Sequence, residues 1–397
     1  MSGATALSGV LDATHPFDRR SRAELERPSS RKWSLHPGTI GAWVAEMDFG
    51  TAPVVAEALH RAIDDQTLGY LSPPTAAELG VATAHWMRRE YGWEVDPDRV
   101  HPVSDVMAAL RVAVEEYSPA GSAVIVPTPA YMPFLTYLPS IGRRVVEVPG
   151  IVTDGRWSHD LDAIDAAFEA GARTLVLCNP HNPTGTMLER AELEAIAAIV
   201  ERHGGRVFAD EIHAPIRFGD RTHIPYASVS DAAAHHAVTG TSSSKAWNTP
   251  GLKAAQLITS NDADDRVYRR FGFAVMHGAS TLGVIASTAA YAHGGEWLNE
   301  VNRYLAGNRS LLSQLVREEL PGARFSAPDA TYLAWLDVSR LGIQGPPADF
   351  FRERAGVALT DGALCGAGSK GFVRLVFAMP RPLLDEAVRA MGAAVRG

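Results

Sequence analysis

The chain has 397 residues, of which 46% are hydrophobic and 21% are charged, and its formal net charge is −8. This length predicts two domains, and the acidic balance without a long basic run argues against nucleic acid or an anionic membrane as a partner. Two cysteines, no signal-peptide pattern and no apolar stretch near the ~20 residues that cross a bilayer predict a cytoplasmic protein without a disulfide framework.

The first 30 residues are polar and contain Pro16, Pro28 and several arginines, which predicts a flexible arm over residues 1–30. After this arm, segments with helical periodicity alternate with short apolar segments. We expect helices at 53–66, 75–91, 105–117, 160–170 and 189–203, and strands at 123–126, 145–148, 174–177, 206–209, 237–239 and 254–259. Strands separated by helices predict an α/β fold with a mostly parallel sheet covered on both faces.

After residue 285 the pattern changes to a long helix at about 296–320 and short strands at 332–337 and 372–377. This change predicts a second, smaller domain of α+β character. We expect the small domain to comprise residues 31–52 and 288–397, and the large domain to comprise residues 53–287.

Lys245 follows the expected strand 237–239 in the run Gly-Thr-Ser-Ser-Ser-Lys-Ala-Trp-Asn-Thr-Pro-Gly-Leu-Lys (240–253). A lysine in this setting can contact a phosphate or form an imine with a carbonyl compound. Two upstream motifs favour the imine. Asn182 lies in Asn-Pro-His-Asn-Pro-Thr-Gly and Asp210 in Arg-Val-Phe-Ala-Asp-Glu-Ile-His, each at the end of a strand, where ligands bind in open α/β sheets. A carboxylate there can pair with the protonated ring nitrogen of a cofactor that acts as an electron sink.

Each of these residues also has an ordinary structural interpretation. Asn182 alone is typical of a turn, and Asp210 alone is typical of a helix cap. Their order and spacing favour chemistry, because Asp210 follows Asn182 by 28 residues and Lys245 follows Asp210 by 35. The histidines and cysteines lack the spacing of metal ligands, so we expect no metal site.

The motifs Asn-Pro-x-Asn-Pro-x-Gly, Asp-Glu-Ile-His and Ser-Lys-x-x-Asn-x-Pro-Gly-Leu resemble those of the pyridoxal-phosphate (PLP) enzymes of aminotransferase class I/II. More narrowly, they resemble the branch of cystathionine β-lyases and cysteine-S-conjugate β-lyases. The resemblance runs to the end of the chain and includes Lys32-Trp33, Trp43–Phe49, Leu68–Tyr70, Thr128–Phe134, His293–Leu298, Ala330–Leu336 and Phe372–Phe377. It implies the PLP-dependent transferase fold type I and a homodimer.

The resemblance also implies roles for the matching residues. Lys245 is expected to hold PLP covalently and to remove the Cα proton of a small amino-acid substrate, while Asp210 keeps the pyridine nitrogen protonated. Arg374 is expected to bind the substrate's α-carboxylate, since a guanidinium can pair with a carboxylate through two hydrogen bonds. The alternative for Arg374 is a surface ion pair, which its apolar neighbours disfavour. Tyr70 matches a tyrosine that relatives contribute across the dimer interface to catalysis, cofactor and substrate.

The other residues implied by the resemblance surround the cofactor. Asn182, which also contacts the substrate, and His213 are expected beside the ring hydroxyl. Tyr131 is expected to stack on the ring, although by itself it is typical of a core aromatic residue. The expected phosphate site comprises Ser104, Asp105, Val106, Ser242, Ser244 and Lys253. Asp105 departs from the glycine that relatives more often have, and capping the helix is its alternative role.

These residues do not decide which bond breaks after the Cα proton has been removed. The branch resemblance favours α,β-elimination of cystathionine or another cysteine S-conjugate to pyruvate, ammonia and a thiol. A PLP-dependent aminotransferase of amino acids would use the same groups and is the alternative. A second alternative is a regulatory protein with the PLP fold that binds a protein partner.

Overall fold

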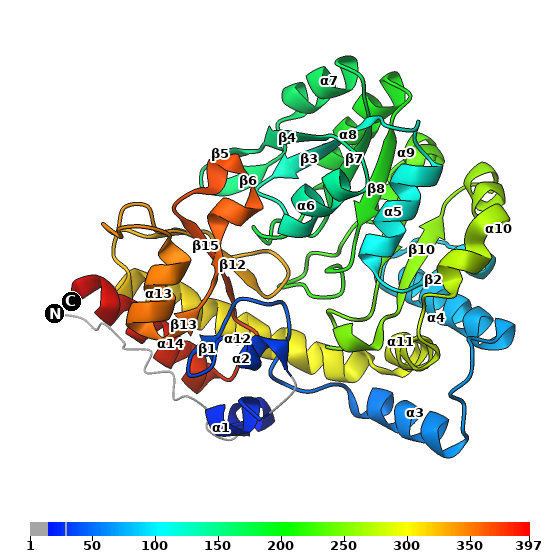
Figure 1. Ribbon diagram of the computed structural model, residues 1–397. Helices are drawn as coiled ribbons and strands as arrows, with labels where there is room; N and C mark the ends of the chain where they lie inside the picture. Colours follow the sequence, from blue (N-terminus) through cyan, green and yellow to red (C-terminus); the bar gives the residue numbers. More distant parts are fainter. Residues whose placement is uncertain (1–14, 28–29) are drawn as a thin grey trace.

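The computed structural model describes residues 15–27 and 30–397 (Figure 1). Its largest sheet has seven strands in the order β2-β10-β9-β8-β7-β3-β4. The strands span Val100–Val103 (β2), Ala123–Thr128 (β3), Val145–Pro149 (β4), Ala172–Cys178 (β7), Arg206–Asp210 (β8), Ala237–Thr241 (β9) and Ala255–Thr259 (β10). Neighbouring strands from β9 to β4 are parallel, whereas β10 is antiparallel to β9 and β2. This topology confirms the predicted α/β fold with a mostly parallel sheet.

Helices cover both faces of this sheet because its strands are apolar on both sides. In β3, Val124 and Val126 pack in one core cluster with Val106, whereas Ile125 packs in the other cluster with Ile164. The first face is covered by α5 (Val106–Glu116), α6 (Met132–Ser140) and α10 (Asp262–Met276), and the second by α7 (Leu161–Glu169), α8 (Arg190–Arg202) and α9 (Asp231–His236). The hairpin of β5 (Ile151–Thr153) and β6 (Arg156–Ser158) extends from β4.

Three further helices, α3 (Pro53–Asp64), α4 (Pro73–Tyr91) and α11 (Thr281–His293), pack together. Helix α4 begins two residues earlier than expected because the Ser72 hydroxyl accepts a hydrogen bond from the Thr75 backbone N–H at 3.3 Å and caps the helix. The expected domain boundary at residue 287 falls inside α11, although α11 packs on α3 and α4. The division into two domains stays a prediction, and a boundary after His293 fits this packing better.

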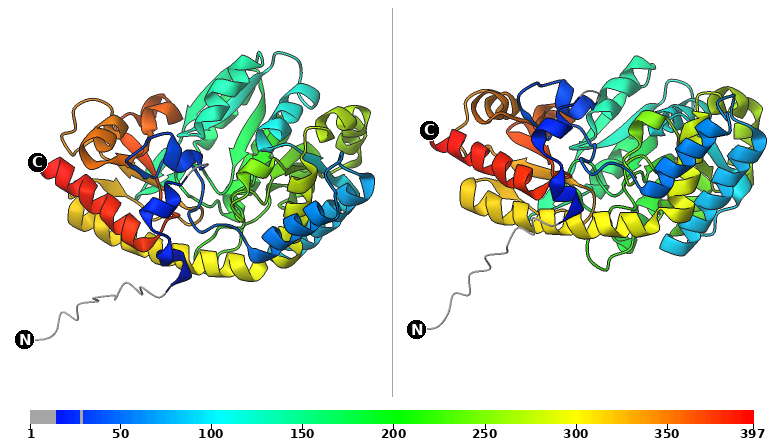
Figure 2. Two further views of the ribbon diagram at one scale, coloured as in Figure 1. Left: turned by 60° about the horizontal axis from the view of Figure 1, so that its bottom comes forward. Right: turned by 90° about the horizontal axis from the view of Figure 1, so that it is seen from below.

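A second, antiparallel sheet has the order β11-β12-β15-β14. Its strands span Arg324–Phe325 (β11), Leu333–Asp337 (β12), Thr360–Asp361 (β14) and Phe372–Val376 (β15). Helices α13 (Pro347–Ala355) and α14 (Arg381–Arg396) lie beside it, and α12 (Gly295–Glu319) runs along one side of the molecule from α11 to α14 (Figure 2). Strand β1 (Ile40–Gly41) pairs with β13 (Val357–Ala358), so the segment that follows α2 (Arg31–Ser34) lies beside the carboxyl-terminal part of the chain.

Residues 15–27 pack against the rest of the chain, in contrast to the flexible arm expected over residues 1–30. They form a 3-10 helix, η1 (Pro16–Arg19), and the short helix α1 (Arg22–Leu25). The buried Phe17 ring stacks on Phe49 with 4.7 Å between centroids, and the Asp18 carboxylate accepts a hydrogen bond from the Arg381 backbone N–H at 2.9 Å. The polar composition of the segment gives no sign of these anchors. Residues 1–14 and 28–29 of the expected arm lie outside the described residues.

Among the helices of residues 15–27 and 30–397, none is by itself long and apolar enough to cross a membrane. Helices α10 and α11 meet those criteria only as a pair, and the chain bends by 118° between them. Both helices contribute to the core, since Tyr268 of α10 and Tyr291 of α11 are buried.

Candidate active site

Asn182 and Lys245 follow β7 and β9, and Asp210 is the last residue of β8, the parallel strand between them. The register pairs Cys178 with Asp210 and Asp210 with Gly240, so the three strands end at the same level. Loops that leave the carboxyl ends of neighbouring parallel strands meet at one edge of the sheet. The three residues singled out by their spacing therefore lie on adjoining segments of one site.

Asp210 is a buried carboxylate with few partners. Its Oδ1 atom accepts one hydrogen bond, from the Ile212 backbone N–H at 3.2 Å, and it forms no ion pair with any described residue. Burial raises the pKa of Asp210 to about 7, against the opposing effects of the Ile212 N–H and the Lys245 charge. An ionised carboxylate in such a place is costly unless a cation pairs with it. Asp210 is therefore suited to bind a cationic group of a ligand.

Lys245 carries an amine that is easily deprotonated. Its Nζ atom donates to the backbone carbonyl of Ala45 at 3.0 Å. Burial, and then the positive charge of Arg374, lowers the pKa of Lys245 to about 8, although Glu46 and Asp210 oppose the shift. A lysine must be neutral to attack a carbonyl or to accept a proton. A pKa of about 8 makes a substantial neutral fraction available near neutral pH.

Arg374 of β15 links the two sheets at the site. One terminal nitrogen donates to the Asn182 side-chain oxygen at 2.9 Å, and the other donates to the Trp43 carbonyl at 2.9 Å and to the Thr360 hydroxyl at 3.2 Å. The Nε–H group is buried and has no hydrogen-bond partner among the described residues. Arg374 also forms no ion pair with any residue of the described chain. A buried guanidinium with a free donor and no anion beside it is suited to bind a carboxylate.

His213 and Tyr131 differ in their exposure at the site. His213 is buried and lies edge-on to Tyr332, with 6.2 Å between ring centroids. Burial, and then the charges of Lys245 and Arg374, lowers the pKa of His213 to about 3, so its ring is neutral. Tyr131 is half-buried at the start of α6, and burial raises the pKa of its hydroxyl. A half-buried aromatic ring can still stack on a planar ligand.

The expected phosphate residues lie at the start of α5 and near Lys245. Asp105 caps α5, because its Oδ1 atom accepts a hydrogen bond from the Ala108 backbone N–H at 2.9 Å. This bond confirms the alternative role that we gave it. Its Oδ2 atom lies 3.3 Å from Nζ of Lys253, which is exposed and has a left-handed backbone with φ of 53°. The buried Ser242 hydroxyl donates to the Ala254 carbonyl at 2.7 Å and accepts from the Ser244 backbone N–H at 3.0 Å.

Tyr70 lies at the surface, where 87% of its area is exposed. Its ring is 5.1 Å from that of His277, centroid to centroid. No hydrogen bond or ion pair joins Tyr70 to another expected site residue within the described part of one chain. The structure of a single chain therefore does not bring Tyr70 into its own site.

The sequence profile described as aminotransferase class I and II matches residues 44–391, which include every site residue that we predicted. The chain belongs to this family. Within the family it is 38% identical to a cystathionine β-lyase of Corynebacterium glutamicum, over 92% of this chain and 96% of the relative. It is 32% identical to the cystathionine β-lyase PatB of Bacillus subtilis, over 96% of this chain and 99% of the relative.

Solved structures of similar proteins agree with this assignment. A candidate PLP-dependent β-cystathionase of Corynebacterium diphtheriae is 39% identical and superimposes with a TM-score of 0.90, over 95% of this chain and 98% of that one. The PLP-bound C–S lyase of Staphylococcus hominis is 28% identical, with a TM-score of 0.87, over 96% of this chain and 98% of that one. These likenesses confirm the predicted PLP-dependent aminotransferase fold.

Backbone groups that we did not predict also contribute to the site of this family member. They belong to residues 42–48, a segment that we call the strap. The Ala45 carbonyl accepts hydrogen bonds from Lys245 at 3.0 Å and from the Tyr332 hydroxyl at 3.1 Å. The Trp43 carbonyl accepts from Arg374 at 2.9 Å. The strap therefore contacts both Lys245 and Arg374.

Asn248 attaches the strap to the segment that carries the site lysine. Its side-chain oxygen accepts from the Met47 backbone N–H at 2.8 Å, and its side-chain nitrogen donates to the Met47 carbonyl at 2.9 Å. The signal in the sequence was the Trp43–Phe49 motif together with the asparagine of Ser-Lys-x-x-Asn. The motif did not indicate what this segment does, because a backbone carbonyl that accepts hydrogen bonds leaves no side-chain pattern in the sequence.

Proposed function

We propose that this protein is a PLP-dependent carbon–sulfur β-lyase that converts cystathionine or another cysteine S-conjugate to pyruvate, ammonia and a thiol. The observation that carries the proposal is the grouping of Lys245, Asp210 and Arg374 at one edge of the sheet. Each is buried or half-buried, and burial shifts the pKa of each toward its neutral form. The similarity to cystathionine β-lyases over most of the chain supports elimination as the reaction.

The residues at this edge fit the cofactor. Asp210 supplies a buried anion for a protonated pyridine nitrogen, and Asn182 and the neutral His213 are available to the ring hydroxyl. Tyr131 offers a ring face for stacking. For the phosphate, the amino-terminal end of α5 offers backbone N–H groups, and the group of residues that we propose to bind it is Ser104, Asp105, Val106, Ser242, Ser244 and Lys253.

Three residues of the chain have separate roles in the reaction: Lys245 transfers a proton, Arg374 orients the substrate and Asp210 pairs with a positive charge. When bound, PLP supplies an electron sink for the charge that is left when the Cα proton departs. Neutral Lys245 accepts that proton at Nζ and holds it as an ammonium close to the Ala45 carbonyl. Arg374 pairs with the α-carboxylate and fixes the substrate, so that the Cα–H bond faces Lys245. Asp210 keeps its negative charge against the ring nitrogen.

The proposal is tested by the products formed without a keto-acid acceptor. We expect the protein with PLP to release pyruvate and a thiol from L-cystathionine in the absence of any keto acid, whereas an aminotransferase requires one. Turnover that depends strictly on an acceptor would favour the transferase alternative. Brisk release of thiol would also exclude a purely regulatory role with a protein partner.

The covalent role of Lys245 is tested separately. The sequence has four lysines, Lys32, Lys245, Lys253 and Lys370, so borohydride reduction followed by peptide mapping can assign the attachment site. We expect the label on Lys245 and a loss of activity of several orders of magnitude in Lys245→Ala. The exposed Lys370→Ala is the matched control, and full turnover of Lys245→Ala would contradict the proposal.

The setting of the enzyme is part of the proposal. We propose a homodimer in the cytoplasm, in which Tyr70 of one protomer enters the site of its partner and contacts cofactor and substrate. The exposure of Tyr70 and the composition of the chain support this arrangement.

A further inference from the structure

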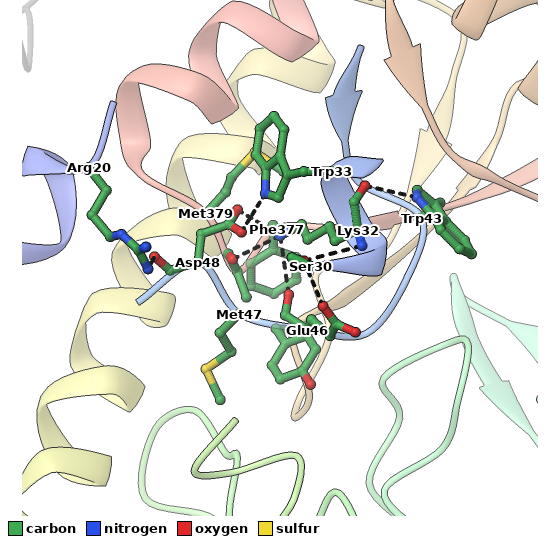
Figure 3. Close-up of polar contacts among 12 residues, drawn as sticks. Arg20, Ser30, Lys32, Trp33, Trp43, Glu46, Met47, Asp48, Phe377 and Met379 are labelled. Atoms are coloured by element: carbon green, nitrogen blue, oxygen red, sulfur yellow. Dashed lines mark hydrogen bonds and ion pairs between the residues drawn. The ribbon is translucent and has the colours of Figure 1, made fainter. Parts of the chain in front are cut away.

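Lys32 and Asp48 form a buried ion pair at the carboxyl-terminal end of the strap (Figure 3). The Lys32 side chain is 0% exposed and that of Asp48 is 3% exposed. The ammonium group donates to the Asp48 carboxylate at 2.7 Å, to the Glu46 carbonyl at 3.1 Å and to the Ala378 carbonyl at 3.3 Å. The second carboxylate oxygen accepts from the Trp33 indole N–H at 2.8 Å. Both charged groups are therefore fully hydrogen-bonded.

Stability alone does not explain this pair. The cost of removing two charges from water largely offsets their attraction, and well-packed apolar residues of similar volume are often as stable or more stable. An apolar side chain, however, cannot bind three acceptors from two different segments. The Lys32 ammonium binds three such acceptors. Glu46 and Asp48 belong to the strap, whereas Ala378 follows β15. The pair therefore fixes the position of one segment relative to the other.

The two segments that the pair joins both lead to the site. The Glu46 carbonyl, which binds Lys32, follows directly after the Ala45 carbonyl, which binds Lys245. The Ala378 carbonyl, which accepts from Lys32 and also from the Asp48 backbone N–H at 3.0 Å, lies four residues after Arg374. A shift of the strap relative to β15 would move the Trp43 carbonyl away from the Arg374 guanidinium.

We propose that Lys32 and Asp48 are positioning residues for binding of the substrate's carboxylate. The pair holds the strap so that the Trp43 carbonyl orients the Arg374 guanidinium toward the substrate. The inference rests on the proposed function, in which Arg374 binds the α-carboxylate. Lys32 and Asp48 act through the strap and contact neither the substrate nor the cofactor.

The first test measures hydrogen exchange in the strap and does not depend on the cofactor. The double variant Lys32→Met/Asp48→Leu removes both charges and leaves no unpaired ion. We expect the backbone N–H groups of residues 47 and 48 to exchange with deuterium at least about tenfold faster. The reason is the loss of an interaction that stabilises the strap against local opening by at least ~1.4 kcal/mol. The control is Arg206→Met/Asp264→Leu, which removes an ion pair of 2.5 Å at the start of β8, the opposite end from Asp210. Unchanged exchange in the strap would overturn the proposal.

The second test separates positioning from general weakening. Titration of the visible band of bound PLP gives dissociation constants for L-alanine and L-alaninamide, which differ in the carboxylate and lack a β-leaving group. We expect the double variant to lose about tenfold of the wild-type preference for the carboxylate, as for the loss of one hydrogen bond to a charged group. The control variant should retain the preference. An unchanged preference in a destabilised double variant would show that the pair serves stability alone.

The two tests distinguish this inference from the proposed function. Absence of a PLP band and of pyruvate in the wild-type protein would refute the β-lyase proposal. The deuterium-exchange result would still decide whether Lys32 and Asp48 hold the strap, because it does not depend on the cofactor.

Discussion

Asp210 and Lys245 carry opposite charges in water, yet burial shifts the pKa of each toward neutral pH. The pKa of Asp210 rises to about 7 and that of Lys245 falls to about 8, and each charge opposes the shift of the other. The two side chains do not form an ion pair with each other in the described structure. Ionisable groups that remain buried, close and unpaired are typical of functional sites, because pairing would better serve stability.

The shifted pKa of Asp210 predicts how the stability of the cofactor-free protein depends on pH. Folded Asp210 keeps its proton up to about pH 7, whereas the unfolded chain releases it near the ordinary aspartate pKa of 3.8, so the free energy of unfolding should fall as the pH rises between these values. Asp210→Asn removes this titration, and we expect it to raise the free energy of unfolding at neutral pH by on the order of a few kcal/mol. Urea unfolding over this pH range measures the effect.

The exposed Asp220→Asn is the matched control for this prediction and should leave the pH dependence unchanged. The difference in the free energy of unfolding between Asp210→Asn and the wild type should vanish below the pKa of the unfolded state, where Asp210 is protonated in both states. A difference in the free energy of unfolding that stays constant at every pH would contradict the raised pKa of Asp210.

At the scale of single elements, the start of α5 combines two functions that conflict. Asp105 caps the helix, yet its negative charge lies where the proposed phosphate would bind and it pairs with Lys253 at 3.3 Å. Asp105→Asn keeps the capping oxygen and removes the charge. We expect the variant to bind PLP several-fold more tightly with little change in melting temperature, as measured by equilibrium titration of PLP and by thermal unfolding.

Helix α7 provides the control for this prediction, because its cap Asp160 accepts from the Ala163 backbone N–H at 3.0 Å, as Asp105 does from Ala108 in α5. Asp160→Asn should leave the affinity for PLP unchanged. Equal or weaker PLP binding by Asp105→Asn would mean that its carboxylate does not oppose the phosphate.

The elements also show what could be predicted from the sequence. Strands β7, β8 and β9 are apolar runs buried on both faces, so their positions and the motifs that follow them could be predicted. The packing of Phe17 could not, since one buried ring in a short polar segment produces no periodicity. The hydroxyl of Ser242 donates to Ala254, twelve residues away, and no local pattern specifies such a bond. The strap acts through carbonyl groups that every sequence possesses.

At the scale of the whole molecule, the position of Tyr70 favours the proposed homodimer. Tyr70 is 87% exposed and Phe273 is 77% exposed, and both rings lie beside His277, with centroid distances of 5.1 and 5.9 Å. Large aromatic side chains that are exposed together are typical of an interface. In a symmetric dimer the same patch occurs on both protomers, so each Tyr70 can enter the other protomer's site.

Mixed dimers test whether Tyr70 acts in its partner's site. Tyr70→Ala and Arg374→Ala should each abolish most activity in a homodimer. In a mixed dimer of these variants, one site carries both changes and the other carries neither, if Tyr70 crosses the interface while Arg374 does not. Random assembly of equal amounts makes about half of the dimers mixed, so about a quarter of the wild-type activity should return. The control mixture pairs Arg374→Ala with Lys245→Ala, whose side chains both contact the strap of one chain, and should recover no activity. A Tyr70 mixture that is as inactive as this control would place Tyr70 outside the partner's site.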